Sequence, residues 1–310
     1  MQGLAVAPAS VEHLLAAFLA SQDVKPGSKA VYERQLRPFF RWAAQARGRK
    51  WDRDTILAYK AHLFARGLSP WTVSSYLVLV RKFFEWAEVA KLYPNIAKGV
   101  KGAARPRGFN KDILTAPEVL KVLKRISRKS LLGKRDFAAL NLMVRTGLRT
   151  VELSRADVGD IRSQGGKRVL WVRGKGRDQK DDFVLLTEDT WNPLCVYLRN
   201  RQALTTPGAP LFASGSDRNF GDRLTTRTFS QAMKAHFRAA GLVSARLTAH
   251  SLRHTAITLA LEAGASLQEA QAMARHANIT TTMVYAQNMS RIRDAAEPKL
   301  QRYLRRKGRW

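Results

Sequence analysis

Three side chains that can bind an anion lie together in the stretch AHSLRHT, residues 249–255. His250 and Arg253 share one face of a predicted helix near its first turn, where backbone N–H groups favour negative charge. An arginine there stays charged and can donate two hydrogen bonds to phosphate. Capping histidines beside a surface arginine are the ordinary alternative. A zinc site at His250 and His254 is disfavoured, because no further ligand lies nearby and Arg253 would repel the cation.

Other chemical groups follow breaks in the helical pattern. TGLRTVEL places Arg149 at a helix start with Glu152 one turn on, and VRGKGRD places Lys175 between two glycines. RHANITTTMVYA contains His276 and, nine residues later, Tyr285. Taken alone, each has an ordinary explanation: a surface salt bridge, an exposed turn lysine, or a tyrosine in a helix core. Together with the 249–255 stretch, they favour chemistry on a phosphate.

The order of these motifs closely resembles the tyrosine recombinase family, which includes phage integrases and Xer-type resolvases. The shared pattern is Arg in TGLRTVEL, Lys in GKG, His-x-x-Arg in HSLRHT, and His followed by Tyr in RHANITTTMVYA. The resemblance covers essentially the whole chain, and the combined pattern is highly specific although each motif alone is weak. It implies a helical core-binding domain followed by a mixed α/β catalytic domain.

The resemblance also implies roles for the residues around the scissile phosphate. Arg149 and Arg253 would clamp it, and His276 would add a third donor. Fixed cations of this kind stabilise the charge that builds up on the non-bridging oxygens. Tyr285 would be the nucleophile and form a covalent 3′-phosphotyrosine.

Proton transfer and positioning fall to three further residues under the same resemblance. Lys175 would protonate the leaving 5′-oxygen, and His250 would act as general acid or base. Glu152 would orient Arg149 rather than touch DNA. Because transesterification conserves bond energy, we expect neither ATP nor a redox cofactor. The sequence offers no metal site, so we also expect no metal.

Three positions depart from the family pattern. Arg275 stands where the family usually has glycine before the histidine, so it could contact DNA and makes the local loop shape uncertain. Asp181 and Asp182 follow the lysine turn where the family tends to be basic. His254 completes the HSLRH pattern, and we expect it to serve in packing.

Helices dominate the predicted elements that must position these groups. Apolar spacing of three and four residues predicts a bundle of about four helices between residues 10 and 93. A basic segment rich in glycine and proline follows at 95–112, and it predicts domains at 1–100 and 113–310 joined by a linker at 101–112. Two β-rich runs at 168–172 and 182–186 flank the lysine turn and predict a hairpin. The fold class is therefore mostly α with a small β-sheet.

Charge and composition indicate the partner. The 310 residues include 54 Lys and Arg against 24 Asp and Glu, a formal net charge of +30, which favours a polyanion such as DNA. A membrane surface fits less well, because no lipidation signal or long amphipathic basic helix stands out. No spanning segment or leader is evident either. The single cysteine, Cys195, lies in an apolar helix and is expected to be an inert core thiol. We expect a cytoplasmic, nucleoid-associated protein.

A site-specific recombinase acting on double-stranded DNA core sites is the leading function. A topoisomerase or telomere resolvase with the same pocket, and a non-catalytic DNA-binding protein, are the alternatives. We expect a monomer in solution and a homo-tetramer on paired sites, closed by the segment after Tyr285 docking on a neighbour. That segment has a short amphipathic pattern that Pro298 interrupts, and it could instead complete its own domain. About ten residues precede the first helix, so a separate arm-binding domain is expected to be absent.

Overall fold

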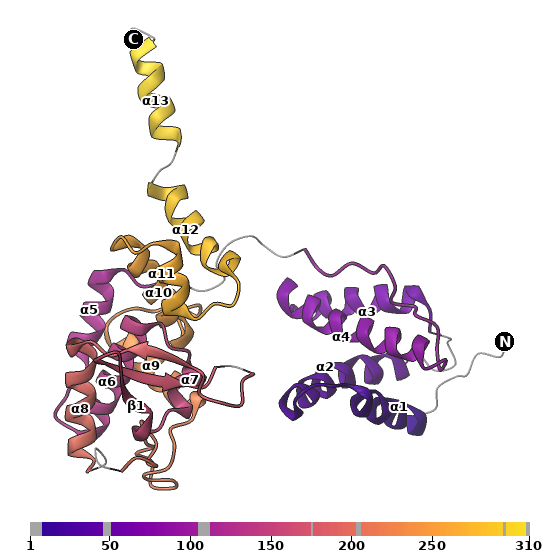
Figure 1. Cartoon of the computed structure of the whole chain (residues 1–310). Helices are drawn as coiled ribbons and strands as arrows, with labels where there is room; N and C mark the ends of the chain where they lie inside the picture. The colour runs from indigo at the N-terminus through magenta and orange to yellow at the C-terminus, as the bar shows by residue number, and fades with distance from the viewer. Residues whose placement is uncertain are drawn as a thin grey trace. The chain divides into compact units, whose positions relative to one another are not determined.

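Two units make up the chain, Met1–Arg107 and Gly108–Trp310 (Figure 1). The computed structural model describes residues 8–45, 51–104, 112–174, 176–202, 206–293 and 296–307. Within those ranges the chain is mostly helical with a single small sheet, so the predicted fold class is confirmed.

The described part of the first unit is a bundle of four helices, as predicted. They are α1 (Pro8–Ser21), α2 (Pro26–Ala44), α3 (Arg53–Ala65) and α4 (Pro70–Val89). Ser69 caps α4 through a 3.3 Å bond from the Thr72 amide, and Pro70 occupies the first helical position. The core between the helices is rich in aromatic rings, for example Phe39 and Phe83, which are 0% and 2% exposed.

The start of the basic segment belongs to this first core, which corrects the predicted boundary at residue 100. Ala97, Val100 and Ala103 are all buried against the bundle. The Ser74 hydroxyl on α4 donates to the Ala103 carbonyl at 3.1 Å. Small apolar side chains at intervals of three residues allow this segment to pack, although its glycines and lysines suggested a linker. Residues 105–111, the rest of the predicted linker, lie outside the described residues.

The second unit is built around α6, whose buried face packs against α8 and α10 (Figure 1). Helices α11 and α12 pack in turn against α10. The helices described in this unit are α5 (Ala116–Arg125), α6 (Leu131–Thr146), α7 (Thr150–Arg155), η1 (Val158–Asp160), α8 (Glu188–Asn200), α9 (Thr226–Ala239), α10 (Ala249–Glu262), α11 (Leu267–Ala274), α12 (Ile279–Arg293) and α13 (Ala296–Lys307). Cys195 is buried in α8, as expected.

A three-stranded antiparallel sheet, ordered β1-β2-β3, completes this unit. The predicted hairpin is confirmed as β2 (Lys167–Val172) and β3 (Asp182–Leu185), with Leu170 opposite Val184. The first strand, β1 (Ile161–Gln164), was not predicted, because three of its four residues are exposed and show no alternation. Gly165 and Gly166, at φ values of 55° and 73°, form the two-residue turn that joins β1 to β2.

Pro298 does not interrupt the C-terminal helix, contrary to expectation. It is the third residue of α13, in the first turn, where the missing N–H has no intrahelical partner to lose. Leu300, Tyr303 and Leu304 of α13 are each more than half exposed. No helix in the described ranges is both long and apolar enough to cross a membrane.

Candidate active site

The break between α6 and α7 positions Arg149. Gly147 ends α6 in a left-handed conformation (φ 63°), and its amide donates to the Met143 carbonyl at 2.9 Å. Leu148 is then fully buried and anchors the turn. Arg149 follows in an extended conformation as the N-cap residue of α7. The predicted Thr-Gly break therefore places an arginine at the N-terminus of a short helix.

Glu152 binds Arg149 through both backbone and side chain. Its Oε2 accepts the Arg149 amide at 2.8 Å, and its Oε1 accepts the Arg149 guanidinium at 2.6 Å. The carboxylate is 1% exposed. Burial alone would raise the Glu152 pKa, but Arg275, the Arg149 amide and the Arg149 guanidinium together lower it below the usual value. Glu152 is thus a buried anion that holds Arg149.

Arg253 lies in α10 and is 2% exposed. Its Nη1 donates to the Gly147 carbonyl at 2.6 Å, and its Nη2 donates to the Ala274 carbonyl. These bonds bring Arg253 next to the Arg149 turn. Burial and the charges of Arg149 and Arg275 lower the pKa of Arg253 to about 9, which leaves it charged at neutral pH.

Tyr285 projects from α12 into the same cluster. The residue is 4% exposed and packs against Ile257 and Ala274. Its hydroxyl lies 2.5 Å from Nδ1 of His254, and the two rings stack with centroids 5.5 Å apart. Burial raises the pKa of Tyr285 to about 12, although Arg253 and Arg149 act in the opposite direction.

His254 therefore does more than pack, which corrects the expectation from sequence. Sequence reasoning missed its contact with Tyr285 because the two residues are far apart in the chain. The repeated histidine in HSLRH was the available signal. His250 is exposed, and its ring meets the His254 ring edge-on at 4.7 Å. The two histidines thus form a row that ends at the tyrosine hydroxyl.

His276 lies in the turn between α11 and α12. Its Nδ1 is 2.9 Å from the hydroxyl of Thr282, which is fully buried. Its ring centroid is 6.2 Å from that of Tyr285. Burial, followed by the charges of Arg253, Arg149 and Arg275, lowers the pKa of His276 to about 4. The imidazole is therefore neutral at pH 7 and can donate a single N–H.

The Arg275 side chain points into the protein, toward Glu152. It ends α11 in a left-handed conformation (φ 55°), and its side chain is 4% exposed. The guanidinium forms a 2.8 Å ion pair with Glu152. Arg275 and Arg149 therefore share one buried carboxylate.

Lys175 lies outside the described residues, so the structure does not place its side chain. Its neighbours are described: Gly176 has a φ of 81°, and the Gly174 carbonyl accepts a bond from Arg155 at 3.5 Å. Asp181 pairs with Arg177, so this acidic residue neutralises a cation of the same loop.

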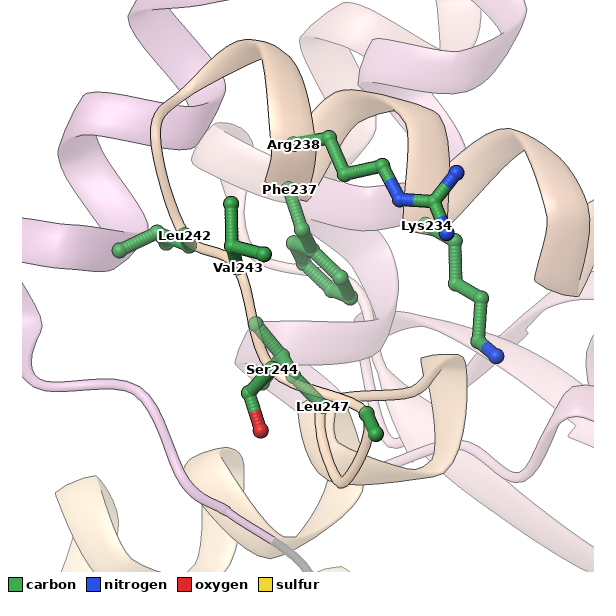
Figure 2. A pocket seen from close by; sticks show the side chains of 8 residues that line it. Lys234, Phe237, Arg238, Leu242, Val243, Ser244 and Leu247 are labelled. Atoms are coloured by element: carbon green, nitrogen blue, oxygen red, sulfur yellow. The ribbon is translucent and has the colours of Figure 1, made fainter.

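A separate pocket of about 190 Å³ lies between α9 and the loop that follows it (Figure 2). Phe237, Leu242 and Val243 give it an apolar lining, and Lys234 and Arg238 belong to its rim. None of the candidate site residues lines it. Over the described part of the chain, no group of three His, Cys, Asp or Glu side chains is arranged to hold a metal ion.

Comparison with known proteins gives consistent matches. The model of the phage integrase family matches residues 112–291. The tyrosine recombinase XerC of Salmonella typhi is 28% identical over 292 residues, which cover 91% of this chain and 93% of the relative. The XerH site-specific recombinase bound to palindromic difH substrate superposes with a TM-score of 0.71 at 21% identity, covering 87% of this chain and 80% of that one. A lambda integrase tetramer bound to a Holliday junction gives a TM-score of 0.67 at 18% identity, over 89% and 76% of the two chains.

The matched family segment spans more than half of the chain and contains every candidate site residue. The sequence relative and the shared fold agree with it. The motif resemblance is thereby confirmed, and the chain belongs to the phage integrase family of tyrosine recombinases.

Proposed function

We propose that the protein is a site-specific DNA recombinase in which Tyr285 attacks a scissile phosphate. The observation that carries this proposal is the 2.5 Å contact between the Tyr285 hydroxyl and His254, in a cluster that also contains Arg253 and Arg149. A buried phenol beside two arginines is poorly explained by core packing alone. It suits a nucleophile held close to cations that bind phosphate.

The proton of the phenol must leave as the phosphorus–oxygen bond forms. With a pKa of about 12, Tyr285 is almost entirely protonated at neutral pH. His254 accepts this proton at Nδ1, because that atom already lies at hydrogen-bond distance from the hydroxyl. His250, in edge contact with His254, is placed to pass the proton toward solvent.

Charge stabilisation falls to the two arginines and His276. The phosphate's non-bridging oxygens gain charge in the transition state, and guanidinium groups held by Glu152 and by Gly147 can receive it without rearranging. His276, neutral at pH 7, donates its single N–H. Arg253 is 2% exposed, so its guanidinium must become more accessible before a phosphate binds to it.

Lys175 supplies the proton to the departing 5′-oxygen, as the family resemblance implies. The bond from phosphorus to the 5′-oxygen breaks, the oxygen takes the lysine proton, and a 3′-phosphotyrosine remains. Lys175→Ala should therefore slow cleavage by ~10²–10⁴-fold on ordinary DNA. A substrate with sulfur at the bridging 5′ position needs no acid, so an equal defect on both substrates would remove Lys175 from this role.

Double-stranded DNA core sites are the proposed partners, with a monomer in solution and a tetramer on paired sites. A related fold is known as a tetramer on a Holliday junction. Helix α13 presents Leu300, Tyr303 and Leu304 to solvent, which suits docking onto a neighbouring copy. Truncation after Asn288 should keep single-site binding within a few-fold and abolish synapsis. Normal recombination by the truncated protein would contradict docking.

The target sequence can be found by trapping. Denaturing purification of the protein from host cells, followed by sequencing of attached DNA, should yield one recurrent site. A plasmid that carries two copies of that site then tests the function. Exchanged products support a recombinase, whereas relaxed plasmid without exchange would show a topoisomerase.

A further inference from the structure

Arg275 occupies a backbone position that disfavours any residue except glycine. At φ 55° and ψ 46° it caps α11 in the left-handed region, where a Cβ atom crowds the following carbonyl. A glycine would take the same conformation without strain.

The side chain contacts the two groups that hold the phosphate-binding arginines. Its Nη2 donates to Glu152 Oε2 at 2.8 Å, and Glu152 binds Arg149. The same nitrogen lies 3.4 Å from the Gly147 carbonyl, which accepts the 2.6 Å bond from Arg253. A further bond runs from Nη1 to the Met273 carbonyl at 2.7 Å. Arg275 thus contacts one group that holds each arginine: Glu152 for Arg149 and the Gly147 carbonyl for Arg253.

The two carboxylate oxygens of Glu152 bind different groups, and this limits how the carboxylate can pair with the Arg149 guanidinium. Oε1 accepts the Arg149 guanidinium, while Oε2 accepts Arg275 and the Arg149 amide. The Arg149 guanidinium is therefore held by one carboxylate oxygen, Oε1, while the Arg149 amide shares Oε2 with Arg275. If Arg275 were absent, both oxygens could turn to the Arg149 guanidinium in a two-bond pair, the geometry that arginine also uses for phosphate. Glu152 would then compete with the DNA for Arg149.

We propose that Arg275 is a positioning residue for strand cleavage: it occupies the second oxygen of Glu152 and so keeps Arg149 available to the scissile phosphate. This inference rests on the proposed function, because it assigns Arg149 to the phosphate. It gives a role to the residue at which this chain departs from the family pattern. Arg275 itself touches neither DNA nor the reacting atoms.

The test compares Arg275→Gly and Arg275→Lys with wild type in single-turnover formation of the covalent complex on saturating DNA. Arg275→Gly should slow this step by ~10²-fold, the effect of a misplaced binding group, with DNA affinity within about 3-fold. Arg275→Lys should recover part of the rate, because an ammonium can still bind Oε2. Gln202→Gly is the matched control: it replaces another non-glycine residue with a left-handed backbone, at φ 57°, and this variant should cleave at the wild-type rate.

A double-mutant cycle separates positioning from simple stabilisation. With Glu152→Gln in place, the carboxylate that Arg275 restrains is gone, so adding Arg275→Gly should change the rate by less than about 3-fold. An equal loss with and without Glu152→Gln would overturn the proposal, as would a wild-type rate for Arg275→Gly. If Arg275→Gly fails to fold, the cycle is run with Arg275→Lys instead, and an equal loss of rate with and without Glu152→Gln would again overturn the proposal. Absence of any covalent complex with wild-type protein would instead contradict the proposed function.

Discussion

Acidification should destabilise the second unit through His276. The imidazole has a pKa of about 4 in the folded chain, against 6.5 ordinarily, because of burial and the nearby guanidinium groups of Arg253, Arg149 and Arg275. Below pH 6.5 the His276 imidazole is protonated in the unfolded chain but stays neutral in the folded chain until the pH approaches 4. Stability is therefore complete above pH 6.5 and falls as the pH approaches 4. At pH 4.5 the loss from this one group is ~2.5 kcal/mol.

The measurement is urea denaturation of the full chain at pH 7 and pH 4.5, for wild type and His276→Gln. Glutamine can still reach Thr282 but does not titrate. On acidification the variant therefore loses the free energy of unfolding that depends on carboxylates, but not the part that depends on His276. Wild type should lose ~2.5 kcal/mol more than the variant over this pH range. Equal losses, or an NMR titration of the His276 ring with a midpoint near 6.5, would refute the assignment of a buried neutral imidazole.

Three further results are expected. His254→Phe keeps a ring against Tyr285 but removes the proton acceptor, so cleavage should slow by ~10²–10⁴-fold with unchanged gel-shift affinity; an unchanged rate would place proton removal elsewhere. The slope of log affinity for DNA against log salt should be steeper than about −5, since each phosphate contact contributes about −0.9; a slope near −1 would contradict binding through many phosphate contacts. Leu142→Ala should lower the free energy of unfolding by ~2–5 kcal/mol in urea titrations, because Leu142 is fully buried in α6; a loss under about 1 kcal/mol would indicate a poorly packed core.

Much of the fold could be predicted because local signals agree with tertiary packing. Thr115 and Ser69 cap their helices, since each side chain satisfies an amide that no helical carbonyl can reach. The hairpin of β2 and β3 was predictable from its β-branched residues. Strand β1 was not, because its exposed face has no apolar alternation, although Gly165 and Gly166 were a usable turn signal.

The site was predictable in its residue types and less so in its contacts. Motif order placed Arg149, Arg253, His276 and Tyr285 together, and the structure brings these residues into one cluster. The partner of Tyr285 depends on how α12 packs against α10, and no local pattern encodes that packing. The direction of the Arg275 side chain likewise depends on its bond to Glu152, a buried carboxylate more than a hundred residues away in the chain.

The central claim is that Tyr285 is the nucleophile. Wild-type protein would be mixed with a nicked duplex that carries the trapped site, digested with trypsin and nuclease, and examined by tandem mass spectrometry. We predict a nucleotide attached through phosphate to Tyr285, in the peptide from α12, and complete loss of the adduct in Tyr285→Phe, which should still bind the site. A nucleotide on another side chain, or an SDS-resistant adduct that persists in Tyr285→Phe, would contradict the mechanism.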